Sequence, residues 1–466
     1  MAAAFAFFAG ISLPLGRVCL VAALVLELRS RAGRAALARA AKSPAFLGWA
    51  AFFVLAAIVS AVAAATITDP LLEPARGLRK LSKLAWTAGL LAVAAEAGRG
   101  SAHAERIVRA FALGAAATGL WIAVAHPVEA WLEAALPSRA ALAASVSDPS
   151  ALSPRERTVV RRAESLGLLD PARYEALQPK RKTVAQFVAA REALDAEPLL
   201  KWAHSGGWKA DTFGAALAKR GTMADAQRLM LGALAALALC LAAARRGDRR
   251  ALARDAAAGA VALAGLFATC KRGPIAVVAV VAAATILAAR FRARRALLAL
   301  ALVALAALAV PQVRGRFAAI PSEFSLQKGG RARMWLVVVP ELHRQHPHGI
   351  GFRSLTYGKM VEIDRARSGG EVRVEVGRTH VHSTPLQTWV DFGWPGPAVW
   401  ALWMAAALAA AVRAARAPGA GAAALAAPAF LLALVLYSLV EYNLADSEIV
   451  LLYALSLGLA AGRYPS

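Results

Sequence analysis

The chain has 466 residues, of which 59% are hydrophobic, and its mean hydropathy is +0.52. This composition exceeds that of ordinary soluble domains and excludes a purely soluble protein. The net charge is +25, from 54 Lys and Arg against 29 Asp and Glu, but much of it lies in short links between apolar segments. That distribution is typical of membrane proteins, so we expect no nucleic-acid partner.

Nearly uncharged runs of about 18–23 residues recur along the chain, and this length crosses a bilayer core of about 30 Å. The runs consist mainly of Ala and Leu without the alternation of a membrane barrel, so we expect helices. The candidate spans are 5–26, 44–66, 81–98, 105–127, 225–244, 254–270, 274–290, 296–311, 386–412, 423–444 and 447–462. The sequence predicts an all-α polytopic membrane protein with 11 or 12 transmembrane helices. The count depends on whether Pro14 and Arg17 divide the first run into a hairpin.

Basic residues indicate on which side of the membrane each link lies. The links at 28–42, 243–255 and 289–296 are rich in Arg, which predicts that they face the cytoplasm. Alternation of the spans then places two longer polar regions on the outer side. The link ARGLRKLSK, residues 75–83, is also basic although this scheme places it outside. Either it binds an anionic group or the span count is wrong nearby.

The two outer polar regions define the expected domain organisation. Region 128–224 has helical spacing of apolar residues between Pro residues, which predicts a helical extracytoplasmic insertion. Region 312–385 is an outer loop that holds most of the candidate chemistry, and its EVRVEV segment predicts a short strand or hairpin. Transmembrane helices fill the remaining parts of the chain, namely 1–127, 225–311 and 386–466.

Cofactor motifs are absent from the sequence. It contains no Walker loop, no dinucleotide-binding fingerprint and no Cys/His spacing typical of a metal site. Cys19, Cys240 and Cys270 lie in or at the ends of apolar spans, as core thiols do. We therefore expect neither a metal nor a soluble cofactor.

Candidate catalytic residues gather near the outer ends of spans. The chain has eight His, and five of them lie between His343 and His382. His titrates near neutral pH and can accept a proton, whereas Arg stays charged and binds phosphate oxygens through two parallel hydrogen bonds. An enzyme that acts on a lipid-linked phosphate at a membrane surface needs both residue types.

Two motifs supply cations. TCKRGP places Lys271 and Arg272 in a tight turn between two spans, and GGRARMW carries Arg331 and Arg333. Trp335 follows Arg331 by four residues and thus shares its helix face. Each motif also has an explanation without a ligand-binding role. Lys271 and Arg272 could extend to lipid headgroups, and Arg331 could be a solvent-exposed Arg on a loop helix.

A third motif, THVHSTPLQTWVDFGWPG, supplies two imidazoles. His380 and His382 precede an apolar segment, and His382 lies at the mouth of the predicted helix. A His at the membrane interface can act as a base or as a polar anchor.

The ordered motifs resemble those of the bacterial O-antigen ligase/polymerase family. The last motif is the strongest match, because five residues fall at the family's spacing: His382, Leu386, Asp391, Gly393 and Gly396. Ser383 stands where the family usually has Asn.

Upstream segments follow the same family order over residues 220–460. RGTMADAQ, which begins at Arg220, is similar to a segment that opens a middle span, and KRG at 271–273 is similar to a Ser-Arg-Gly turn. Arg331 and Trp335, followed by Pro347, Gly349 and Gly351, are similar to the next motif, although the Pro is one residue nearer the first Gly than in the family. Glu441 is similar to a Glu near the last spans.

The resemblance implies a GT-C-like membrane glycosyltransferase of the bacterial inner membrane. Such an enzyme moves a glycan from undecaprenyl pyrophosphate to an acceptor hydroxyl on the periplasmic side, with inversion and without metal, and 312–385 would be its catalytic loop. His382 would be the catalytic base. Arg272 and Arg331 would bind the pyrophosphate and stabilise it as it leaves, with Lys271 and Arg333 as second choices for pyrophosphate binding. Four further residues are second choices for the site: His380, Arg220, Asp391 and Glu441.

Three functions remain open from the sequence. The first is an O-antigen ligase, which joins the glycan to lipid A-core in lipopolysaccharide biosynthesis. The alternative within the family is a polymerase of O-antigen or exopolysaccharide that joins lipid-linked repeat units, and the insertion at 128–224 leaves it open. A polysaccharide-lipid transporter or flippase is the alternative from another class. It predicts ionisable residues at mid-span and an internal repeat, whereas the candidate charges here lie at span ends.

Overall fold

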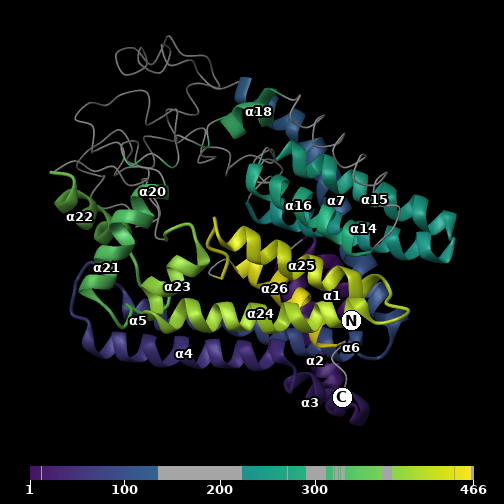
Figure 1. The fold of residues 1–466 in the computed structure, drawn as a ribbon, viewed down its shortest axis with the longest axis horizontal. Coiled ribbons are helices and arrows are strands. Elements are labelled where there is room, and N and C mark those ends of the chain that lie inside the picture. The colour runs from purple at the N-terminus through teal and green to yellow at the C-terminus, as the bar shows by residue number, and fades with distance from the viewer. Residues whose placement is uncertain are drawn as a thin grey trace, which may run out of the picture. The chain divides into compact units, whose positions relative to one another are not determined.

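The computed structural model describes most of the chain as helices (Figure 1). The described residues are 1–11, 13–134, 223–269, 271–289, 311–318, 320, 324, 326, 331–369, 380–444 and 447–462. The chain divides into two compact units, one formed by Met1–Leu120 with Met223–Ser466 and the other by Trp121–Thr222. Nearly all of the predicted insertion at 128–224, the EVRVEV segment and the span expected at 296–311 lie outside the described residues.

Long apolar helices confirm the expected all-α polytopic membrane protein. Five described helices are long and apolar enough to cross a membrane: α4 (Pro44–Thr66), α7 (Ser101–Ala134, over Ser101–Ala123), α14 (Met223–Arg246), α15 (Arg249–Ala268) and α24 (Pro395–Arg416). Three shorter apolar helices accompany them: α16 (Arg272–Ala288), α25 (Ala422–Ser438) and α26 (Ser447–Ala461). The total of 11 or 12 spans stays a prediction.

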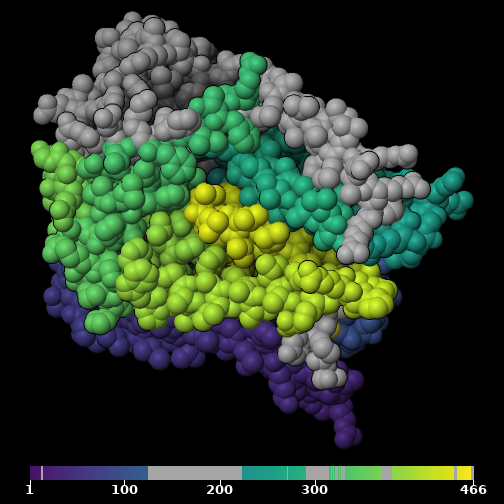
Figure 2. Space-filling model, viewed as in Figure 1, coloured from purple at the N-terminus to yellow at the C-terminus, as the bar shows by residue number. Residues whose placement is uncertain are grey.

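Burial separates inner helices from outer ones. The described side chains of α14 and α25 are mostly buried, as are those of α26 from Ile449 onward. In contrast, α4 and α24 each expose large apolar side chains, as lipid-facing helices do. Figure 2 shows the purple surface of α4 running beside the yellow-green surface of α24. Phe52 packs on Trp403 between them, with ring centroids 5.6 Å apart.

Two expected spans in the N-terminal part of the chain are divided in the structure. The run at 5–26 divides into α1 (Ala2–Ala9) and α2 (Leu13–Arg29), because Pro14 lacks a backbone N–H and suits only a helix start. The run at 81–98 divides into α5 (Pro74–Ala85), the 3-10 segment η1 (Trp86–Gly89) and α6 (Leu90–Ala97). At this interruption Gly89 packs so closely on Leu20 that an added Cβ would overlap it.

The short helices outside these spans carry the candidate chemistry. In chain order they are α18 (Pro311–Ala318), α20 (Arg331–Arg333), the π-helical turn η4 (Met334–Val338), α21 (Val339–Gln345), α22 (Tyr357–Arg367) and α23 (Thr384–Phe392). A further amphipathic helix, α3 (Arg31–Ala41), lies between α2 and α4. Most of the short helices from η4 to α23 pack around a common apolar core that contains Leu72, Met334, Val338, Leu342, Met360 and Val390.

The run expected at 386–412 is also divided, because Gly393 ends α23 with a φ of +66° and Pro395 begins α24. At this break the turn before Gly349 crosses the end of α23. A Cβ added to Gly393 would lie 2.6 Å from the carbonyl oxygen of Pro347, and one added to Gly349 would lie 2.5 Å from that of Asp391. The backbones approach so closely that only glycine fits.

Gly393→Ala is expected to lower the thermal unfolding midpoint of the purified protein far more than Gly419→Ala. Both glycines have positive φ, which costs an Ala roughly 1–3 kcal/mol. Nothing lies within 4 Å of a Cβ at Gly419, whereas Gly393 would also force two backbones apart. Equal shifts in detergent-solubilised protein would contradict this close packing.

Candidate functional site

The segment between the two imidazoles is fixed from both sides. The backbone N–H of Val381 donates to Gln387 Oε1 at 2.9 Å, and its carbonyl oxygen accepts from Trp335 Nε1 at 2.7 Å. His382 has a φ of +50°, an uncommon conformation for a residue with a side chain. Together these contacts bring the rings of His380 and His382 to a centroid distance of 4.5 Å.

A polar turn after α25 brings Glu441 to these imidazoles. Thr384, at the start of α23, donates to the carbonyl oxygen of Glu441 at 3.0 Å and accepts from the N–H of Asn443 at 3.2 Å. The side chain of Asn443 in turn accepts from Gln227 of α14 at 3.0 Å. The backbone N–H and C=O groups of this turn have no partners in a regular helix. They thus form hydrogen bonds to side chains, which allows the turn to be buried.

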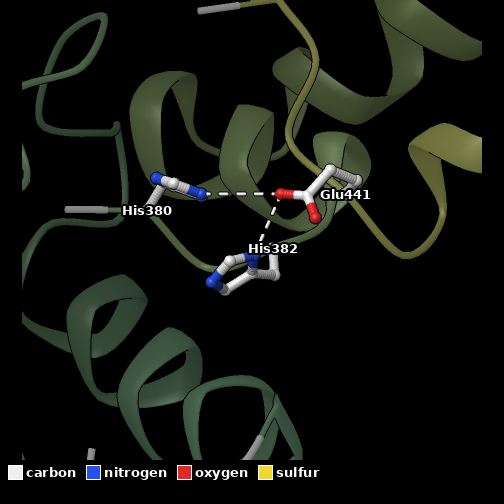
Figure 3. Close-up of side chains that lie close together, drawn as sticks. All are labelled: His380, His382 and Glu441. Carbon is white, nitrogen blue, oxygen red and sulfur yellow. Dashed lines mark hydrogen bonds and ion pairs between the residues drawn. The ribbon is translucent and has the colours of Figure 1, made fainter. Parts of the chain in front are cut away.

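Glu441 is the centre of the site, as Figure 3 shows. Its Oε1 lies 2.9 Å from Nδ1 of His382 and 3.6 Å from Nε2 of His380, while its Oε2 lies 3.6 Å from Nη2 of Arg331. Burial raises the pKa of the Glu441 carboxyl, but hydrogen bonds from His380 and His382 outweigh burial and hold the pKa below its usual range. The carboxylate is therefore charged at neutral pH.

The cluster is closed on one side and open on the other. The side chain of His382 is only 6% exposed, whereas those of His380 and Arg331 are 24% and 21% exposed. A ligand can therefore reach the cluster past His380 and Arg331.

A second buried carboxylate supports the first. Asp391 accepts from Gln387 Nε2 at 2.8 Å, from the Tyr442 hydroxyl at 3.2 Å and from the backbone N–H of Arg353 at 3.2 Å. The N–H of Tyr442 also lies 3.3 Å from Oε1 of Glu441, so one hydrogen-bond network joins the two carboxylates. Burial raises the pKa of Asp391 to about 7 despite these bonds.

Asp391→Asn is expected to flatten the pH dependence of stability between about pH 4 and pH 7. Because the folded-state pKa of Asp391 is raised, the folded protein binds this proton more tightly than the unfolded chain does. The stabilisation is complete below the unfolded pKa and is lost as pH rises through about 7. At about 1.4 kcal/mol per pKa unit, the loss is roughly 4 kcal/mol at most. Unfolding midpoints of wild type and variant across this range measure it, and parallel profiles would contradict it.

The predicted cations are distributed unequally around the site. Arg331 borders Glu441, whereas Arg333 is buried against Asp364, with Nε and Oδ1 2.5 Å apart. Lys271 caps the start of α16, of which Arg272 is the first residue. Arg220 lies outside the described residues.

The turn that holds Lys271 and Arg272 contacts the helix that leads to Glu441. A Cβ added to Gly273 would lie 2.7 Å from the ring of Tyr437 in α25. Tyr437 lies within electrostatic reach of both Glu441 and Arg331. The fold therefore brings the neighbourhood of Arg272 close to the cluster.

Sequence reasoning missed the residues that position the cluster, among them Thr384, Gln387 and Tyr442. The dipeptide Tyr442–Asn443 directly after Glu441 is a signal, since polar residues between two apolar runs need buried partners. Of the five clustered His residues, only His380 and His382 join the site, and His343 instead accepts from Trp389 Nε1 at 3.1 Å.

The donor set of the cluster also suits a metal ion. Among the described residues, His380, His382 and Glu441 offer ligand atoms that all lie within 4.8 Å of one another. Two imidazoles and a carboxylate are typical ligands of Zn²⁺ and related ions. The expectation that the protein works without metal stays a prediction.

Comparison with known families finds a match for part of this chain. Residues 257–401 match the family model described as O-Antigen ligase. The matched segment runs from within α15 into α24 and contains both the cations of the 271–272 turn and the His380–His382 segment. A search among curated proteins found no match. The chain is a multi-pass membrane protein, and the match over residues 257–401 supports an enzyme of the O-antigen ligase/polymerase type.

Proposed function

We propose that the protein transfers a glycan from undecaprenyl pyrophosphate to a hydroxyl of lipid A-core at the periplasmic face of the bacterial inner membrane, as an O-antigen ligase. The match to the O-antigen ligase family model supports a glycosyltransferase-like enzyme with a lipid-linked glycan and an acceptor as substrates. The observation that carries the proposal is the buried His382–Glu441 pair with Arg331 beside it. In this proposal 312–385 is the periplasmic catalytic loop, and the insertion 128–224 also lies on the periplasmic side.

His382 acts as the general base. With Nδ1–H donating to Glu441, Nε2 is the ring nitrogen that takes the proton of the acceptor hydroxyl. The Glu441 carboxylate orients the ring and stabilises the imidazolium that forms, as the acidic member of a catalytic triad does. The acceptor oxygen then forms a bond to the anomeric carbon as the bond from that carbon to the pyrophosphate oxygen breaks. Displacement from the opposite face inverts the configuration.

Arg331 and Arg272 stabilise the departing pyrophosphate. Negative charge builds on the leaving oxygen in the transition state, and fixed cations stabilise this charge best in a site that is partly closed to water. Arg331 is held by Glu441 at the open side of the cluster, where a lipid pyrophosphate can reach it. Lys271 adds a further charge at the Arg272 turn. Arg333 is bound to Asp364 and supports the fold.

A reconstituted transfer assay tests this function. Purified protein in liposomes would receive undecaprenyl-pyrophosphate glycan, with lipid A-core in one sample and no second acceptor in another. Glycan on lipid A-core, lost in His382→Ala, supports the ligase. Chain lengthening on the carrier without acceptor would instead identify a polymerase. Movement of the carrier lipid between leaflets without any transfer would identify a transporter.

A further inference from the structure

The helix α5 presents a row of cations that the proposed function does not use. Arg76, Arg79, Lys80 and Lys83 recur at spacings of three and four residues and thus lie on one face of the helix. Arg76 and Arg79 are exposed and the two Lys are partly exposed. The opposite face, formed by Gly77, Leu81 and Leu84, is buried. These cations lie in the basic link at 75–83, for which the sequence analysis considered binding of an anionic group.

The structure attaches α5 to the loop that supports the candidate site. Gly77 packs on Phe352 and Ser354 so closely that an added Cβ would overlap both, and the N–H of Glu73 donates to the carbonyl oxygen of Ser354 at 3.0 Å. The N–H of Arg353, between these contacts, binds Asp391. The basic face of α5 is therefore connected to the network around Glu441. Figure 1 shows α5 beside the end of α4.

The cations of this region repel one another. Burial, followed by the charges of Arg353 and Arg76, lowers the pKa of Lys80 to about 8. Glu73 is the carboxylate that acts on Lys80, and it already forms an ion pair with Arg76. A bound anion would offset this repulsion.

Exposed apolar side chains lie on α5 and on the neighbouring α4. Leu78 of α5 and, on the neighbouring α4, Ile58 and Val62 are 39%, 58% and 54% exposed. Since α4 is long and apolar enough to cross a membrane, its exposed side chains are expected to face lipid tails. A ligand that matches both parts has an anionic head and a hydrocarbon tail.

We propose that the basic face of α5, together with Arg353, binds the phosphate headgroup of a membrane lipid that carries a phosphomonoester or pyrophosphate. Arg forms paired hydrogen bonds with phosphate oxygens, and Lys adds point charge. A phosphorylated glycolipid acceptor and the polyprenyl pyrophosphate donor share this headgroup chemistry. The binding does not depend on transfer activity, so it is tested separately from the proposed function.

Native mass spectrometry of the full chain in detergent measures the binding. Wild type would be titrated with dioleoyl phosphatidic acid, a phosphomonoester, and with dioleoyl phosphatidylglycerol and phosphatidylcholine, which are phosphodiesters. We expect about tenfold tighter binding of phosphatidic acid, and loss of that preference in the double variant Arg79→Gln/Lys80→Gln. The matched control Arg413→Gln/Arg416→Gln, exposed at the last turn of α24, should bind like wild type.

In this titration the proposal is overturned by equal binding of the three lipids, by an unchanged preference in the α5 double variant, or by an equal loss in the α24 control. The charge-conserving variant Arg79→Lys/Lys80→Arg should retain the preference, which separates lost charge from misfolding. Competition against bound phosphatidic acid by lipid A or by undecaprenyl pyrophosphate then identifies the source. The lipid that displaces it at the lower concentration is the natural occupant, and displacement by neither contradicts the proposal.

Discussion

Replacing His382 with Ala is expected to lower the rate of glycan transfer by about 10²–10⁴-fold, the contribution of a positioned general base. Without the imidazole, the acceptor hydroxyl has no group to take its proton, while Glu441 and Arg331 keep their places around the donor. The loss should appear in kcat more than in KM, because the proton moves only in the transition state. Initial rates with varied acceptor in the reconstituted assay measure both constants.

Two further variants decide whether His382 acts as a base. His382→Gln can form hydrogen bonds but cannot accept the proton, so it should be as inactive as His382→Ala. Added imidazole should restore part of the activity of His382→Ala only. Full activity in either variant would remove His382 as the base and direct attention to His380, whose Nε2 also faces Glu441.

Arg331→Ala is expected to reduce kcat by about 10²–10³-fold, since one group that stabilises developing negative charge is lost. The fold should tolerate the change, because the Arg331 side chain is 21% exposed and its distance to Glu441 is 3.6 Å. Arg331→Lys keeps the charge but not the paired hydrogen bonds, and it should retain an intermediate rate. Transfer rates and unfolding midpoints would be measured on the same samples.

Arg333 is the matched control, two residues along the same short helix. Arg333→Ala leaves the Asp364 carboxylate buried without its cation, so we expect a loss of stability of about 3–5 kcal/mol. The two variants should therefore separate, with activity lost in Arg331→Ala and stability lost in Arg333→Ala. A stable, fully active Arg331→Ala would contradict the role of Arg331 at the leaving group.

Local properties of the chain were readable from sequence. Nearly uncharged runs such as 44–66 and 225–244 predict α4 and α14, because a bilayer requires each segment to satisfy its own backbone hydrogen bonds. The order of the cationic motifs and of the His382 motif pointed to the same family whose model matches residues 257–401. Pro14 and Gly393 are residue types that commonly interrupt helices. Hydropathy nevertheless predicted one continuous span across each of them, because the residues on both sides are apolar.

Only the tertiary structure decided which polar side chains meet. His382 and Glu441 are 59 residues apart, and their 2.9 Å contact depends on Thr384 holding the turn after α25. The sequence ranked Arg331 ahead of Arg333 only through the family resemblance, whereas the structure separates them physically, because packing turns one toward Glu441 and the other toward Asp364. Hydropathy and residue spacing predict which residues share a face of one helix, but not which side chains of distant segments come into contact. The position of a charge in a membrane protein is instead fixed by the buried partners that several distant segments bring to it.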